Sequence, residues 1–147
     1  MKFYETIHDV YFDDLDAFQI LHNARYLLLF ERTIGSFWSH FGFSGLPSSA
    51  TNPDHFQLVR YNELDYLKPV IGIGQVRVRV WVERLGRTSI TFRLRMSPLD
   101  EDMDYATGRR VVVKVNPETK KPESWTKEFC ERIAPYVENT DQTAVRA

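Results

Sequence analysis

The sequence has almost no cysteine and no long apolar run. Cys130 is the only cysteine among 147 residues, so no disulfide can form within the chain and a reducing compartment such as the cytoplasm is favoured. The longest strongly apolar run, residues 26–30, is far below the ~20 residues that a membrane-spanning helix requires. The N-terminus lacks the basic and then apolar pattern of a signal peptide. We therefore expect a cytoplasmic protein without a membrane span.

The chain also lacks a strong net charge. Its formal charge is -1 at pH 7, which argues against a nucleic-acid binder or a membrane-surface protein. With 43% hydrophobic and 14% aromatic residues, the composition is typical of a globular protein with a ring-rich core. The length predicts a single domain over residues 1–147, with a peripheral tail from about residue 135.

Alternating apolar residues predict several β-strands. Every second residue is valine in the segment 76–82, and every second residue is apolar in the segment 90–96. Both sets are even-numbered, so sharing one sheet face requires a hairpin loop of three residues, such as 85–87, or of five. Further strands are expected at residues 4–12, with Phe12 on the buried face, at 56–67, and at 105–115, with Val111, Val113 and Val115 on one face.

Apolar residues spaced three and four apart predict one long helix over residues 23–41. The stripe consists of Leu27, Phe30, Ile34, Phe37 and Phe41. Leu28, Leu29 and Trp38 lie on the other sides, so this helix must be enclosed. A sheet curled around it leaves part of it uncovered, and we therefore expect a symmetric homodimer or a dimer of dimers.

The remaining segments are predicted to be connections and a short terminal helix. Residues 42–54 form a loop, residues 97–104 a turn, and residues 125–133 a short helix, with a frayed tail from Thr140. The acidic turn lacks the glycine and the terminal glutamate of a calcium loop, so we expect no metal site there.

Polar and apolar residues mix irregularly between the first strand and the helix, over residues 14–26. Asp16 supplies a carboxylate, and the helix that follows offers unpaired backbone N–H groups and a dipole that favour developing negative charge. A carboxylate beside such donors can serve thioester hydrolysis.

This segment resembles a family motif. Asp16-Ala17-Phe18 through His22-Asn23-Ala24-Arg25-Tyr26, with Phe30-Glu31, is similar to the D-A-x-G-H-V-N-N-A-x-Y stretch of hotdog-fold thioesterases of the 4-hydroxybenzoyl-CoA thioesterase type. Tyr66-Leu67-Lys68-Pro69-Val70 and Leu85-Gly86-Arg87-Thr88-Ser89 resemble that family's Y-x-x-P-V and L-G-x-T-S segments. The resemblance covers about residues 4–115. It implies an α+β hotdog fold, a curved antiparallel sheet wrapped around one long central helix.

The resemblance also implies an activity, the hydrolysis of an acyl-CoA thioester to free acid and CoA. Asp16 would be the nucleophile or the general base, and the backbone N–H of Asn23 would be the oxyanion donor. His22 and Tyr26 would lie near the substrate. No metal or redox cofactor is implied, and CoA enters only as part of the substrate.

Two positions depart from the motif. Gln19 stands where the family has glycine, so we expect either a reshaped turn or an amide that projects into the acyl pocket or toward the attacking water. His22 stands at the family's first asparagine and adds a titratable group beside the thioester. These departures bear on substrate choice more than on reaction class.

Positive charge is needed to bind the phosphates of CoA. Arg84 and Arg87 flank the predicted hairpin, where the resembling family often binds the nucleotide of CoA. Ser89 could hydrogen-bond the pantetheine or a neighbouring strand. Four other arginines, Arg77, Arg79, Arg93 and Arg95, are expected on the outer sheet face. Like charges on adjacent strands repel unless acids or a second sheet neutralise them, so we expect this face to be solvated or in contact with another subunit.

Two other classes of function remain open from the sequence alone. A non-catalytic acyl-CoA or acyl-carrier-protein binding module would use the same fold if Gln19 and His22 blunt hydrolysis. A hotdog dehydratase or hydratase would depend on His22 more than on Asp16.

Overall fold

The computed structural model describes residues 1–43 and 52–138. The elements, in chain order, are β1 (Tyr4–Val10), η1 (Phe12–Asp14), α1 (Asn23–Phe41), β2 (Gln57–Tyr66), β3 (Gly74–Leu85), β4 (Ser89–Ser97), β5 (Ala106–Lys114), α2 (Lys127–Ile133) and η2 (Ala134–Tyr136). Residues 44–51 of the predicted loop and the tail from Thr140, predicted to fray, lie outside the described residues. The predicted bounds of the long helix are confirmed.

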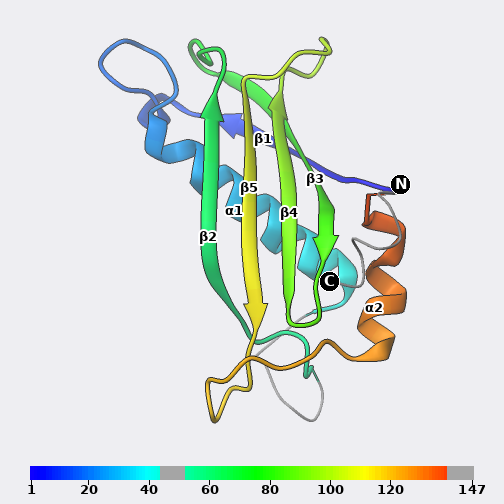
Figure 1. The fold of residues 1–147 in the computed structure, drawn as a ribbon. Coiled ribbons are helices and arrows are strands. Elements are labelled where there is room, and N and C mark those ends of the chain that lie inside the picture. Colours follow the sequence, from blue (N-terminus) through cyan, green and yellow to red (C-terminus); the bar gives the residue numbers. More distant parts are fainter. Residues whose placement is uncertain (44–51, 139–147) are drawn as a thin grey trace.

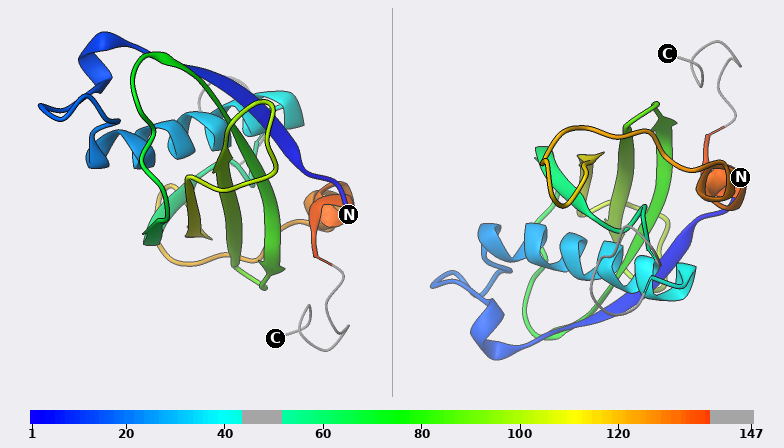
Figure 2. Two further views of the ribbon diagram at one scale, coloured as in Figure 1. Left: turned by 90° about the horizontal axis from the view of Figure 1, so that it is seen from above. Right: turned by 90° about the horizontal axis from the view of Figure 1, so that it is seen from below.

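Within the described residues, five strands form one antiparallel sheet in the order β1-β3-β4-β5-β2. Figure 1 shows α1 lying across one face of this sheet, and the end-on views in Figure 2 show the sheet bending around it. The predicted hotdog fold is confirmed. None of the helices in the described ranges combines the length and the apolarity that a membrane crossing requires.

The concave face of β3 and β4 confirms the predicted alternation. Every even-numbered residue from Val76 to Val82 and from Ile90 to Met96 is at most 2% exposed. The connection has three residues, as the odd count required, but they are 86–88 rather than 85–87. Leu85 remains in the ladder, paired with Ile90, because a bulge beside Val82 shifts the register by one.

Two residues that were predicted to be buried are exposed. Phe12 is 78% exposed because β1 ends at Val10 and the chain turns into η1. Leu27 is 37% exposed because it lies on the side of α1 away from the core, and the buried stripe starts at Tyr26 and Leu29 instead.

Two of the three valines of β5 face outward. Val112 pairs with Ile90 of β4, so the even-numbered positions of β5 share the concave face and Val111 and Val113 lie on the convex one. The concave positions are Ala106, Gly108, Arg110, Val112 and Lys114, all of them buried. Two positively charged residues therefore lie on the inner side of the sheet, where the sequence pattern did not predict them.

Gly108 sets the distance between α1 and the sheet. A Cβ atom at this position would lie 2.5 Å from Cε2 of Phe30, well inside van der Waals contact. The ring of Phe30, which is 1% exposed, therefore occupies the space that any larger residue of β5 would need. The helix can pack this closely only because residue 108 is glycine.

Polar contacts hold the other side of α1 to β1. The hydroxyl of Thr33 lies 2.7 Å from that of Thr6 and 2.8 Å from Nε2 of His8, and the hydroxyls of Tyr4 and Ser36 are 2.7 Å apart. Burial, aided by the positive charge of Arg32, lowers the pKa of His8 below its ordinary value of 6.5. The ring is therefore neutral at pH 7 and can share a hydroxyl proton.

The two inward-facing cations are paired with residues from distant parts of the chain. Nζ of Lys114 lies 3.0 Å from Oδ1 of Asp54 and donates to the carbonyl of Ser124 at 2.9 Å. The guanidinium of Arg110 donates to Asn62 at 2.8 Å and to Glu31 on α1 at 3.3 Å. Burial of these charges is tolerated because each has a partner.

Three of the four arginines that were predicted on the outer face form ion pairs within the described part of the chain. Arg79 pairs with Glu5 at 2.8 Å, Arg93 with Glu83 at 4.0 Å and Arg95 with Asp104 at 2.8 Å. Arg77 donates to the carbonyl of Glu101.

We expect Asp54→Ala to destabilise the fold by about 3–5 kcal/mol, because Lys114 would be left buried without its counter-charge. Glu123→Ala is the matched control. Its carboxylate lies 3.9 Å from the same Nζ but is 44% exposed, so its loss should cost less than about 1 kcal/mol. Urea unfolding at one fixed protein concentration measures both, and equal losses would contradict the importance of the buried pair.

Candidate active site

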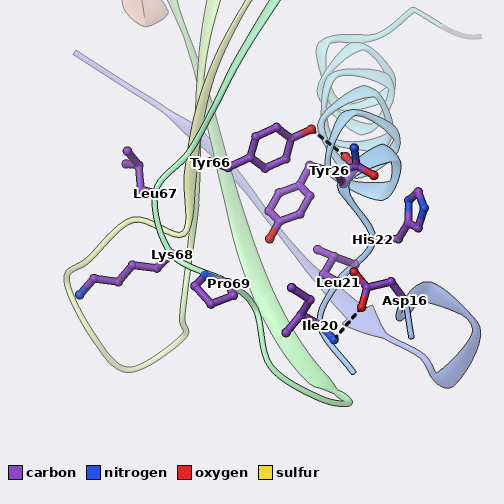
Figure 3. Close-up of a pocket in the computed structure, with 10 residues that line it drawn as sticks. Asp16, Ile20, Leu21, His22, Tyr26, Tyr66, Leu67, Lys68 and Pro69 are labelled. Carbon is purple, nitrogen blue, oxygen red and sulfur yellow. Dashed lines mark hydrogen bonds between the residues drawn. The ribbon is translucent and has the colours of Figure 1, made fainter. Parts of the chain in front are cut away.

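A cavity of about 400 Å³ opens where the β1–α1 connection, the start of α1 and the end of β2 meet. Its lining residues, most of them labelled in Figure 3, are Asp16, Ile20, Leu21, His22, Asn23, Tyr26, Tyr66, Leu67, Lys68 and Pro69. Asp16, His22, Asn23 and Tyr26 were predicted site residues, and the structure brings them together.

Asp16 begins a tight turn that its own backbone closes. The N–H of Asp16 donates to the carbonyl of Ile20 at 2.9 Å, and the N–H of Gln19 donates back to the carbonyl of Asp16 at 3.0 Å. Its side-chain Oδ1 accepts from the N–H of Phe18 at 2.8 Å and from that of Ile20 at 3.4 Å. Within the described residues no hydrogen bond to Oδ2 is found, so one carboxylate oxygen is held and the other is available.

The Asp16 turn is anchored to the connection between β2 and β3. The N–H of Leu21 donates to the carbonyl of Val70, and the N–H of Gly72 donates to the carbonyl of Gln19, both at 2.9 Å. Leu21 is 2% exposed, and its burial fixes the chain just before α1 begins.

Gln19 adopts a left-handed backbone conformation, with φ of 64°. This is the left-handed conformation that favours glycine. The side chain is exposed and does not line the cavity of its own chain. The conformation costs about 1–3 kcal/mol for a residue with a Cβ atom.

The first turn of α1 is capped by His22. Its Nδ1 accepts from the N–H of Ala24 at 3.1 Å, and its carbonyl accepts from the N–H of Arg25 at 2.8 Å. The hydrogen bonds found in the described part of the chain leave the N–H of Asn23 without an acceptor. This group lies at the positive end of the helix dipole, and Asn23 lines the cavity.

Two tyrosines form the wall between α1 and β2. The rings of Tyr26 and Tyr66 meet edge to face with centroids 4.9 Å apart, and Figure 3 shows them pointing toward one another. Burial raises the pKa of Tyr26 above 10.0, and the negative charge of Asp16 acts in the same direction, while a hydrogen bond with the backbone of Val70 opposes it. The phenol therefore stays protonated at neutral pH.

Asp14 contacts residues around η1 rather than the cavity. Its Oδ2 accepts from the N–H of Tyr11 at 2.8 Å, and its Oδ1 lies 3.6 Å from Nε of Arg25. These contacts close η1 and do not bring Asp14 to the cavity.

The other predicted binding residues lie far from Asp16 within one chain. Arg84, Arg87 and Ser89 belong to the β3–β4 hairpin, which is at the opposite end of the sheet from the start of α1 (Figure 1). Arg84 and Ser89 share a second hollow, of about 410 Å³, with Arg60, Tyr61, Thr91 and Val111. Arg87 is exposed beside it.

The sequence did not indicate that residues 66–69 line the cavity. The segment Tyr66 to Val70 matched a family motif, but it was used only as support for the fold. Tyr66 ends β2 beside α1. Lys68 follows in the β2–β3 connection, and Figure 3 shows its side chain pointing away from Asp16. Arg60 was also not predicted. Spacing along the chain could not have placed these residues, because their neighbours come from other elements.

Fold and cavity together define a hotdog protein with a carboxylate at the start of its central helix. The model of the thioesterase superfamily matches residues 18–103, which is more than half of the chain. The chain therefore belongs to the thioesterase superfamily, its resemblance to the hotdog thioesterases is confirmed, and it is a thioester hydrolase.

Similar proteins agree with this membership. YsmA of Bacillus subtilis is 28% identical over 124 residues, covering 84% of this chain and 80% of YsmA. SAV2348 of Staphylococcus aureus, solved in complex with CoA, has a TM-score of 0.82 at 16% identity, with 96% of this chain and 87% of that chain covered. Slr0204 of Synechocystis, a 1,4-dihydroxy-2-naphthoyl-CoA thioesterase, has a TM-score of 0.78 at 14% identity, with 90% and 96% covered. At such identities the two structures support the fold alone.

Substitution of Gln19 tests the left-handed turn. We expect Gln19→Gly to change the free energy of unfolding by less than about 1 kcal/mol, because relief of strain offsets the greater freedom of the unfolded chain. Gln19→Val should destabilise the protein by more than about 1 kcal/mol, since a β-branched residue rarely adopts positive φ. Urea unfolding measures both, and a valine variant as stable as the glycine variant would show that the turn relaxes.

Proposed function

We propose that the protein hydrolyses acyl-CoA thioesters to a free acid and CoA, with Asp16 as nucleophile or general base and the N–H of Asn23 as oxyanion donor. The observation that carries this proposal is that both residues line one cavity, with one carboxylate oxygen and one helix-start N–H both available. The CoA complex of SAV2348 and the substrate named for Slr0204 support CoA as the carrier.

In the general-base route, Asp16 takes a proton from water as the oxygen of that water attacks the thioester carbonyl. Negative charge develops on the carbonyl oxygen, where the Asn23 N–H and the helix dipole stabilise it. The C–S bond then breaks, and the thiolate of CoA takes up the proton from Asp16. One water is consumed, and a free acid and a thiol leave.

In the nucleophilic route, a carboxylate oxygen of Asp16 attacks the same carbonyl. Collapse of the adduct releases the CoA thiolate and leaves a mixed anhydride between Asp16 and the acyl group. Water then hydrolyses the anhydride and restores the carboxylate. Both routes use the same oxyanion donor, and apart from water every group that acts on the substrate belongs to the protein.

Asp16→Asn should lower kcat/KM for its best acyl-CoA substrate by about a hundredfold or more. The amide keeps an oxygen that can accept the N–H of Phe18, so the turn and the fold should survive. Asp14→Asn is the matched control, two residues away and outside the cavity, and should retain activity within about threefold. Release of free thiol from a panel of short, long and aromatic acyl-CoAs measures both.

Either of two results would overturn this assignment. A fully active Asp16→Asn variant would place the chemistry on another group, and His22 would be tested next. If no thioester is hydrolysed but acyl-CoA raises the thermal stability of the wild type, a binding module replaces the enzyme.

The hollow around Arg84 is the proposed contact for the phosphates of CoA. Its lining combines Arg60 and Arg84 with the hydroxyl residues Ser89 and Thr91, a set of cationic and neutral donors suited to phosphate oxygens. Arg87 lies next to it on the hairpin. The hollow is on the convex face, since Thr91 and Val111 are odd-numbered residues of β4 and β5.

A second copy of the chain would bring this hollow to Asp16. β2 is an edge strand with Leu58, Val59 and Tyr61 each about half exposed, so its free backbone groups and apolar side chains favour pairing. Antiparallel pairing of two β2 strands about a two-fold axis places the Tyr66 end of one beside the Gln57 end of the other. The Arg84 hollow of one subunit would then lie near the cavity of its partner, in a homodimer or a dimer of dimers.

Mixed oligomers test this arrangement. Asp16→Asn and Arg84→Glu should each lower kcat/KM by about tenfold or more as separate proteins. Refolded together in equal amounts, they should regain about a quarter of the wild-type activity, because half of the dimers contain one intact composite site. Wild type mixed with the double variant should give less activity than the average of the two parents, since mixed dimers then have no intact site. Activity that only averages the parents in both mixtures would place Asp16 and Arg84 in the same subunit's site or in separate sites.

A further inference from the structure

The cavity beside Asp16 is a groove between the start of α1 and the end of β2, and in the proposed reaction it holds the acyl part of the thioester. Its opening is apolar, with Ile20, Leu21 and Pro69 around the carboxylate. How far this groove continues decides which acyl groups fit. The inference below rests on the proposed function, since it takes Asp16 as the point at which the thioester is held.

Tyr66 bounds the groove on the side of β2. Its hydroxyl donates to the carbonyl of Asn23 at 2.8 Å, a bond that joins the end of β2 to the first turn of α1. Its ring also meets the ring of Tyr26, which is 4% exposed. The two rings form a wall of the groove where α1 meets the end of β2 (Figure 3).

Further contacts fill the space behind this wall. Phe30, one turn along α1 from Tyr26, packs against Gly108 with no room even for a methyl group. Beyond it, Arg110 bridges Asn62 of β2 to Glu31 of α1. A long acyl chain in this direction would have to displace the aromatic wall and then the Phe30 contact.

We propose that Tyr66 is the specificity-determining residue of this thioesterase and that its substrates carry compact acyl groups, a short chain or a single aromatic ring. The ring of Tyr66 sets the end of the acyl pocket, and its hydrogen bond to Asn23 holds the ring in place. A flat acyl group can pack against the faces and edges of the tyrosine pair. A chain that extends past the wall has no space within this groove.

Comparison of one compact and one extended substrate tests the proposal. Wild type should hydrolyse benzoyl-CoA with a kcat/KM at least about tenfold above that for decanoyl-CoA. Tyr66→Ala should lower this benzoyl to decanoyl ratio by about tenfold or more, because the wall is removed. Tyr66→Phe keeps the ring and loses only the hydroxyl, so it should shift the ratio by less than about threefold. Tyr66 is 53% exposed, and its truncation opens no core cavity; circular dichroism and thermal unfolding check the fold.

Binding without turnover gives an independent readout. The thioethers S-benzyl-CoA and S-decyl-CoA cannot be hydrolysed, and their affinities can be measured by calorimetry in the Asp16→Asn background. Tyr66→Ala should shift the ratio of these affinities toward the decyl compound, and Tyr66→Phe should not.

The outcomes separate the inference from the proposed function. Wild type that hydrolyses neither of these thioesters nor any other acyl-CoA of the panel overturns both. Wild type that hydrolyses decanoyl-CoA as well as benzoyl-CoA, or a Tyr66→Ala variant with unchanged substrate and thioether ratios, overturns the role of Tyr66 and leaves the role of Asp16 intact.

Discussion

The site depends on the backbone hydrogen bonds that join the Asp16 turn to the β2–β3 connection. They link Leu21 to Val70 and Gly72 to Gln19, both at 2.9 Å. Because the turn is anchored on both sides, Asp16 meets the start of α1 in one fixed orientation. A carboxylate that is already oriented needs no reorganisation when substrate arrives, which is a large part of what an enzyme site contributes. The left-handed conformation of Gln19 is a local strain that this anchoring sustains.

The same packing that places α1 also limits the acyl groove. Gly108 allows Phe30 to approach the sheet, and this contact brings the N-terminus of the helix to the end of β2. The contacts that stabilise the fold occupy space that a long acyl chain would need. Widening the groove in a related chain would therefore require a change in how the helix is held, or a partner surface that supplies the missing volume.

The elements with a strong periodic pattern were predictable from the sequence, and so was the presence of Asp16 and Asn23 beside the start of the helix. Alternation placed β3 and β4, and Asp16 with Asn23 came from the family motif. Arg110 and Lys114 were not predictable, because charged residues in an alternating strand normally face solvent. Their burial depends on Asp54 and Glu31, which lie far away in sequence. Tyr66 was visible in a motif, but its place in the wall of the groove required the packing of β2 against α1.

The separation of Asp16 from Arg84 has a consequence for the oligomer. Within one chain the cavity beside Asp16 and the Arg84 hollow lie at opposite ends of the sheet, so in the proposed arrangement a substrate with reactive and phosphate ends is bound by two sheets side by side. A two-fold axis along the exposed edge of β2 would form two such sites at once, because each end of one sheet then faces the opposite end of the other. In the proposed dimer the apolar edge residues thus do more than stabilise association. They complete both sites, and hydrolysis should weaken on dilution even where the fold of each subunit survives.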